Sequence, residues 1–118
     1  MPTAQYEGFG YFAAAERLDD DAWLDLTLAT ARLCSSGLEQ ASQIARRASE
    51  HPDDPRAAWL IAALLRSRLD LWEVFEIGRI GVDIYRRSGA SDPAAMAELR
   101  ERLLEREFFE VRDENDSE

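Results

Sequence analysis

The sequence predicts an all-α fold built from antiparallel helix pairs, because three observations point to helices. One helical segment recurs along the chain, and helix start and stop signals return between the segments. No segment shows the convincing alternation of apolar and polar residues that is typical of a half-buried strand. We expect about five or six helices joined by turns of about two to six residues.

The recurring segment is offset by 36 residues, since residues 22–32 align with residues 58–68. Self-similarity at such a period is typical of stacked helical repeats, which usually bind other proteins. Five of the eleven aligned positions are identical, namely Ala22/Ala58, Trp23/Trp59, Leu24/Leu60, Leu28/Leu64 and Arg32/Arg68.

Length and composition indicate one acidic domain. The chain has 118 residues, 46% of them hydrophobic, and a net charge of −10 from 24 acidic and 14 basic residues. Such a field repels phosphate backbones and anionic membrane surfaces, so we expect neither nucleic acid nor a membrane as partner. It would attract a basic protein segment, or it serves solubility alone.

The remaining composition favours a cytoplasmic bacterial protein. All 14 basic residues are arginine and Asn115 is the only asparagine, a usage typical of GC-rich coding sequences. Cys34 is the only cysteine and is expected to be a buried, inert thiol. Neither an apolar run long enough for a transmembrane helix nor a secretory signal is apparent.

The first half of the chain contains an N-terminal arm with a short predicted helix, followed by two longer predicted helices. Residues 1–19 form this arm with a short helix, and its four aromatic residues either plug the end of the stack or contact a partner. The acidic run 19–21 opens the next helix, which ends at residues 35–37. Ser36 and Glu39 have the spacing of a capping box for a helix that stops at His51-Pro52.

The second half contains three helices with equally clear starts. Asp54-Pro55 begins a helix to about residue 68, and Asp92-Pro93 begins one to about residue 109. Between them, Asp70 and Glu73 resemble a capping box for a helix over residues 71–87. We expect one helical domain over residues 20–110 and a disordered acidic tail over residues 111–118.

Two features of the predicted helix 71–87 affect its packing. Gly78 and Gly81 each cost about 1 kcal/mol relative to alanine, which indicates that a neighbouring helix approaches closely. Trp72 and Phe75 lie one turn apart at the helix start. They are either core residues or an exposed aromatic hot spot for binding.

The pattern resembles the tetratricopeptide repeat, in which each unit pairs two antiparallel helices. The family places a bulky residue early in its first helix and small residues at spacings of four and three in its second. Trp23 with Leu26 and Thr27, Trp59 with Ala62 and Ala63, and Ala41, Ala45 and Ala48 match these positions. The resemblance covers about two units, from Asp20 to Pro93.

The resemblance implies a right-handed stack whose concave face, lined by the first helices, binds a peptide or helix. The leucines of this lining form one stripe ending in arginine, which suits an apolar groove with an anion-binding edge. Alternatively, the chain covers these leucines with its own arm or last helix. The expected partner-binding residues are Leu24, Leu28, Arg32, Leu60, Leu64, Ser67 and Arg68.

No motif predicts an enzyme, a metal site or a cofactor. The single histidine, His51, lies at a helix end, and no cysteine–histidine cluster has metal-ligand spacing. The glycines at 78 and 81 lie inside a helix rather than in a phosphate-binding loop. The run 19–21 lacks the spacing of a calcium loop and is expected to be a helix N-terminus.

The expected function is therefore a non-catalytic adaptor or chaperone that holds a partner helix or peptide. Two repeats bury their faces poorly alone, so we expect another protein or a second copy to cover them. Length, charge and the charged last helix are also similar to the small repeat-type chaperones of type III secretion. The alternative is an acidic immunity or inhibitor protein that blocks a basic toxin or enzyme.

Overall fold

The computed structural model describes residues 18–33, 40–88 and 92–111, which form five α-helices, one short 3₁₀ helix and no strand. The all-α class is thereby confirmed. The predicted short helix of the N-terminal arm, Cys34, the capping box at Ser36 and the acidic tail lie outside the described residues, apart from Leu18 and Val111. The helices are α2 (Asp20–Leu33), α3 (Ala41–Ala48), α4 (Pro55–Arg66), α5 (Leu71–Ser88) and α6 (Pro93–Glu105), followed by the 3₁₀ helix η1 (Phe109–Val111).

Four of the five predicted start signals cap their helices as expected. The fifth, Ser36 with Glu39, lies outside the described residues, and α3 begins at Ala41 after Gln40, which makes no side-chain cap hydrogen bond. A carboxylate accepts hydrogen bonds from the first free backbone N–H groups, which have no partner inside the helix. Asp70 and Glu73 form a reciprocal capping box, with backbone-to-carboxylate distances of 2.8 and 3.1 Å. The other three caps are Asp19 to Ala22 N, Asp54 to Arg56 N, and Asp92 to Ala94 N and Ala95 N.

The helix ends differ more from the predictions. The helix expected to reach His51 ends at Ala48, and the last helix ends at Glu105 instead of about residue 109. Glu107 adopts a left-handed φ of 69°, and the Phe108 N–H donates to the Leu103 carbonyl at 2.9 Å. This is the hydrogen-bond pattern of a Schellman motif, with glutamate where glycine is usual, so the sequence carried no glycine signal for it.

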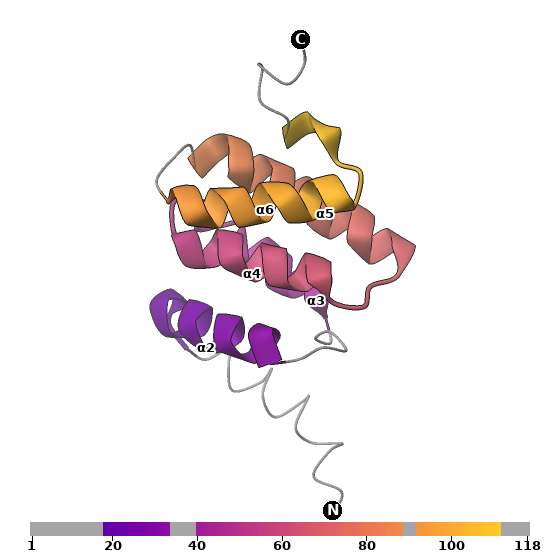
Figure 1. Cartoon of the computed structure of the whole chain (residues 1–118). Helices are drawn as coiled ribbons and strands as arrows, with labels where there is room; N and C mark the ends of the chain where they lie inside the picture. The colour runs from indigo at the N-terminus through magenta and orange to yellow at the C-terminus, as the bar shows by residue number, and fades with distance from the viewer. Residues whose placement is uncertain (1–17, 34–39, 89–91, 112–118) are drawn as a thin grey trace, which may run out of the picture.

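The helices form two rows (Figure 1). The first row contains α2, α4 and α6, and the second row contains α3 and α5. The central helix, α4, contacts all four of the other α-helices. Seven of its twelve residues are buried for this reason, and the hydrophobic core lies around it.

Gly81 allows the two rows to approach closely. A Cβ atom at this position would lie 3.0 Å from Leu103 Cδ2 and 3.1 Å from Ile61 Cγ2. The predicted role of this glycine in close helix packing is confirmed.

The two copies of the repeated segment are not equivalent in depth. Trp23 is buried beneath the Arg47 guanidinium of α3, whereas Trp59 is half-buried beside Arg32 of α2. An offset of 36 residues relates Arg32 to Arg68, but it relates Arg47 to an aspartate, Asp83. The contact of the Arg47 guanidinium with Trp23 is therefore not reproduced around Trp59. Assignment of these pairs to the tetratricopeptide repeat stays a prediction. No helix in the described ranges is long and apolar enough to span a membrane.

Candidate functional site

The leucine stripe predicted to line a groove lies inside the hydrophobic core. Leu24 and Leu64 are each only 1% exposed, and Leu28 and Leu60 are buried as well. This corrects the prediction of an open groove, because side chains packed on all sides offer no face to a partner. The cause is the central position of α4, which leaves only a narrow strip of that helix uncovered.

The three polar residues of the predicted site are not gathered around a groove. Ser67 is buried and its hydroxyl donates to the Leu64 carbonyl at 2.6 Å, at the end of α4. Arg32 is exposed, with its guanidinium carbon 5.5 Å from the centroid of the Trp59 ring. Arg68 is exposed in the α4–α5 connection. A partner-binding role for Arg32 and Arg68 stays a prediction.

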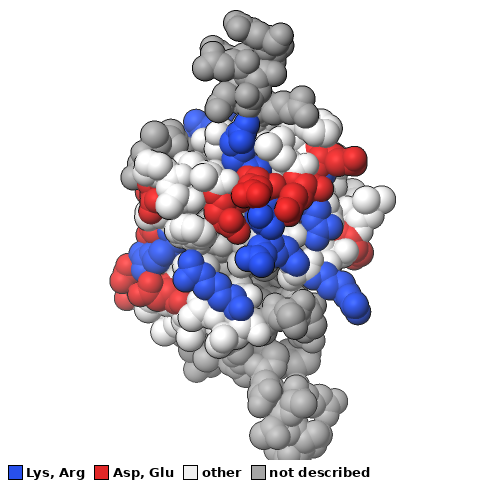
Figure 2. All heavy atoms as spheres, viewed as in Figure 1, with Lys and Arg blue, Asp and Glu red and all other residues white. Residues whose placement is uncertain are grey.

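The face of the first row is charged rather than apolar. Figure 2 shows acidic and arginine side chains lying next to one another on it. On α6, Arg102 pairs with Glu98, Glu101 and Glu105, the closest contact being 2.9 Å to Glu105. Arg102 and these three glutamates therefore neutralise one another in part on the surface of α6.

The exposed large apolar side chains gather instead at the start of α5. Leu71 is 85% exposed, Trp72 72% and Phe75 52%. A cluster of exposed apolar side chains on a small protein commonly marks an interaction site. The sequence left Trp72 and Phe75 open between core and surface, and the structure places them on the surface. The remaining large exposed apolar residues described are Leu26, Leu33 and Phe109.

The packing of α5 explains why these aromatic residues point outward. The opposite stripe of the helix, with Ile77, Gly81 and Ile84, faces the core and is buried. Positions 72, 75, 79 and 83 therefore fall on the outer surface, and each of these residues is exposed. The signal that could have separated the two stripes is the position of Gly81, which requires close packing on its own side.

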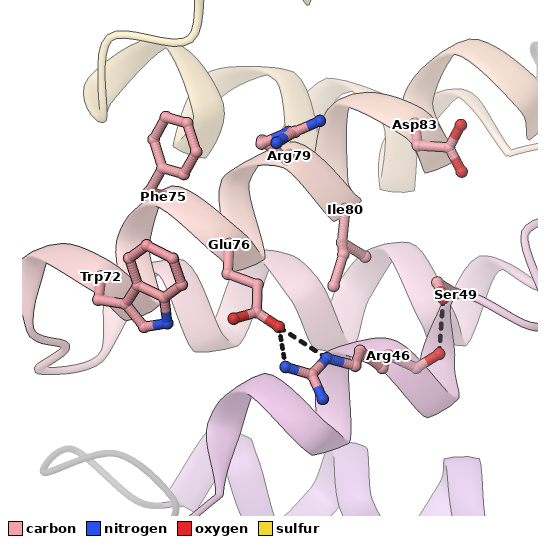
Figure 3. A pocket seen from close by; sticks show the side chains of 8 residues that line it. All are labelled: Arg46, Ser49, Trp72, Phe75, Glu76, Arg79, Ile80 and Asp83. Atoms are coloured by element: carbon pink, nitrogen blue, oxygen red, sulfur yellow. Dashed lines mark hydrogen bonds and ion pairs between the residues drawn. The ribbon is translucent and has the colours of Figure 1, made fainter.

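A hollow of about 660 Å³ lies between this outer surface and α3. Figure 3 shows Trp72 and Phe75 at one end of it and Asp83 at the other. Across the floor, Arg46 Nε of α3 donates to Glu76 Oε1 of α5 at 2.6 Å, and a second guanidinium nitrogen pairs with the same oxygen. This ion pair holds the two helices of the second row together beneath the hollow.

A second hollow of about 340 Å³ lies on the other side of the outer surface of α5, between α5 and η1. Both hollows share Phe75, Arg79 and Asp83, so they form one continuous surface across α5. Phe108 forms its far wall and lies directly over Gly78, where a Cβ atom would overlap the phenyl ring.

We name this continuous surface the α5 face. Its charged groups are mostly paired: Glu76 with Arg46, Asp83 with Arg87 at 3.0 Å, and Arg86 with the Glu110 carbonyl at 3.4 Å. What remains available for binding is aromatic and aliphatic surface. The α5 face is defined by Arg46, Ser49, Trp72, Phe75, Glu76, Arg79, Ile80, Val82, Asp83, Arg86, Phe108 and Glu110.

The other concentration of charge surrounds Arg56 where α2 and α4 begin. Its guanidinium donates to Asp21, Asp25 and Asp54 at 2.6 to 2.7 Å. The hydrogen bond from Arg56 lowers the pKa of Asp54, and the same carboxylates raise the pKa of Arg56. The cluster joins two helices, and in the described ranges no group of acidic, cysteine and histidine side chains is arranged to hold a metal ion.

Comparison with known proteins adds no further assignment. No protein-family model matches the chain, and no curated protein or solved structure matches it either.

Proposed function

We propose that the protein is a non-catalytic interaction module that binds a segment of another protein on the α5 face. The observation that carries the proposal is the exposure of Trp72 and Phe75, on adjacent turns, at the mouth of a hollow of about 660 Å³. Aromatic side chains supply much of the binding energy at protein interfaces, since they bury a large area with few rotatable bonds.

The surroundings of the two aromatic residues support binding rather than chemistry. Two of the three carboxylates of the α5 face, those of Glu76 and Asp83, are each paired with an arginine, and the third, that of Glu110, lies at the edge of the face beside η1. A general base needs a carboxylate free to accept a proton from a substrate. Apolar surface framed by paired charges suits the rim and centre of a protein interface.

An adaptor or a chaperone would use such a face in the same way. A chaperone, including one of the type III secretion class, would cover the apolar side of an aggregation-prone helix until that helix reaches its own assembly. The acidic inhibitor alternative receives less support, because Arg56 already neutralises part of the acidic cluster formed by Asp21, Asp25 and Asp54.

The test is affinity capture from a lysate of the encoding organism with three forms of the full-length protein. The site variant is Trp72→Ala/Phe75→Ala, and the matched control is Leu26→Ala/Leu33→Ala, which removes two exposed apolar side chains from α2. We expect a polypeptide that the wild type and the control retain and the site variant loses. Far-ultraviolet circular dichroism should be the same for all three forms, since the altered side chains are exposed.

The proposal is overturned if every polypeptide retained by the wild type is retained equally by the site variant. It is also overturned if the control loses the same polypeptide, because the binding surface would then include α2.

A further inference from the structure

The outer residues of α5 repeat with the spacing of a helix–helix seam. Trp72, Phe75, Arg79, Val82 and Arg86 follow one another at intervals of three and four residues. This is the heptad spacing with which one helix packs along another. Trp72 and Arg86 are 14 residues apart along α5, so the seam extends over about 21 Å, within the length of a partner helix of similar size.

The middle of this seam carries an arginine without a carboxylate partner among the described residues. The guanidinium carbon of Arg79 lies 5.7 Å from the centroid of the Phe75 ring, and Arg79 is exposed. Its neighbours differ: Arg46 pairs with Glu76, and Arg87 pairs with Asp83. Arg79 thus lies beside an aromatic ring on the surface that a partner would cover, where its donors can reach that partner.

A second copy of the chain is a poor occupant of this seam. Arg79 lies midway between Trp72 and Arg86, so a two-fold axis through the centre of the seam brings Arg79 against Arg79 of the other copy. Like charges placed together at an interface oppose binding. A different chain can place a carboxylate at the same point.

On the basis of the proposed function, we infer that the occupant of the α5 face is an amphipathic helix of another protein with one acidic residue at its centre. Apolar side chains on the turns before and after that residue would fill the hollows beside Trp72 and Phe75 and beside Phe108. The central carboxylate would accept hydrogen bonds from the Arg79 guanidinium, which is partly desolvated once the helix is bound.

The test uses three synthetic helical peptides of about 18 residues. Each peptide has five positions at intervals of three and four residues that would face the seam of α5. The four outer positions carry leucine, and the peptides differ only at the central position, which is glutamate, glutamine or arginine. Fluorescence anisotropy measures their binding to the full-length protein. We expect the glutamate peptide to bind about tenfold more tightly than the arginine peptide, as for one partly buried charge pair.

The variant Arg79→Glu should reverse this order, and Arg79→Gln should reduce the difference to less than about twofold. Arg66→Glu is the matched control, since it makes the same change in net charge on α4, outside the α5 face, and should leave the order unchanged. Both positions are exposed, so the variants are expected to fold.

The inference is overturned if the wild type shows no preference among the peptides, if it binds none of them, or if Arg79→Glu keeps the wild-type order. It is also overturned if sedimentation shows a dimer of the wild type that Trp72→Ala dissociates, since the occupant would then be a second copy. If all three peptides bind equally and Trp72→Ala/Phe75→Ala abolishes their binding, this inference fails but the proposed function stands. Failure of the proposed function is recognised separately, by affinity capture.

Discussion

At the scale of single residues, Arg56 makes the densest set of polar contacts in the described structure. It donates to its own helix cap, Asp54, and reaches across to Asp21 and Asp25 in the first two turns of α2. Asp21 and Asp25 are largely exposed, whereas Asp54 and Arg56 are mostly buried. The contact with Asp54 should therefore contribute most of the stabilisation, because exposed pairs are weakened by solvent.

We predict that Arg56→Gln lowers the free energy of unfolding by about 1–2 kcal/mol at pH 7. The folded-state pKa of Asp54 is depressed below its usual value of 3.8, mainly by the hydrogen bond from Arg56. When folding lowers the pKa of a carboxylate, the ionised carboxylate stabilises the folded state at every pH above the unfolded-state pKa. This stabilisation is lost as the pH falls through the folded-state pKa. The difference between wild type and variant should thus shrink below about pH 4 in urea titrations.

Arg66→Gln on the same helix is the control for this prediction. Arg66 is exposed and lies 3.9 Å from Glu98, so its removal should change the unfolding free energy by less than about 0.5 kcal/mol. A difference between wild type and Arg56→Gln that is equal at pH 3 and pH 7 would contradict the assigned role of the Asp54 carboxylate.

At the scale of helices, the sequence predicted starts better than ends. Four of the five starts depend on a local side chain, such as Asp54 or Asp92, whose carboxylate caps the residues that directly follow it. The exception is α3, which begins after Gln40 without a side-chain cap. The end of α6 depends on distant groups as well, since the Arg106 guanidinium donates to the carbonyls of Leu65 and Ser67 at 2.7 and 3.1 Å. Only the packing of α6 against α4 brings those groups together.

The candidate site was predicted less well than the helices, for a related reason. Leu24 and Leu60, which the repeat aligns, are both buried, but spacing alone does not tell which of two adjacent apolar stripes is covered. Whether an apolar stripe is buried depends on how many other helices pack against its helix, and four helices pack against α4. For the same reason, Trp72 could not be assigned to core or surface before the neighbours of α5 were known.

Close packing at Gly78 leads to a prediction about the contact between α5 and the chain after α6. Gly78→Ala should lower the free energy of unfolding by about 1 kcal/mol, although alanine is the better helix former, because the new methyl group displaces the Phe108 ring. In the background Phe108→Ala, the same substitution should instead stabilise by about 1 kcal/mol. Chemical denaturation of the four proteins in this double-mutant cycle measures the coupling. Stabilisation by Gly78→Ala in both backgrounds would show that the ring does not rest on Gly78.

At the scale of the whole molecule, charge is distributed by helix direction. The contacts of Arg56 with α2 and of Arg106 with the end of α4 show that the first-row helices run in the same direction. Aspartates therefore lie where these helices begin and arginines where they end. These charges are opposite in sign to the partial charges of the helix dipole at each end, which is a stabilising arrangement. Many of the charges are thus neutralised in local pairs, and the remaining net charge of −10 acts at long range, where it affects encounter more than affinity.

This separation of long-range charge from local contacts predicts how binding depends on salt. The affinity of the wild type for the glutamate peptide should fall less than about fivefold between about 50 and 500 mM NaCl, because one ion pair is screened while aromatic burial persists. An arginine-rich peptide of equal length is the control and should lose most of its binding over the same range, since only the net charge of −10 attracts it. Anisotropy titrations at several salt concentrations give both slopes. If the glutamate peptide shows the steeper slope, charge rather than the aromatic surface of Trp72 and Phe75 dominates its recognition.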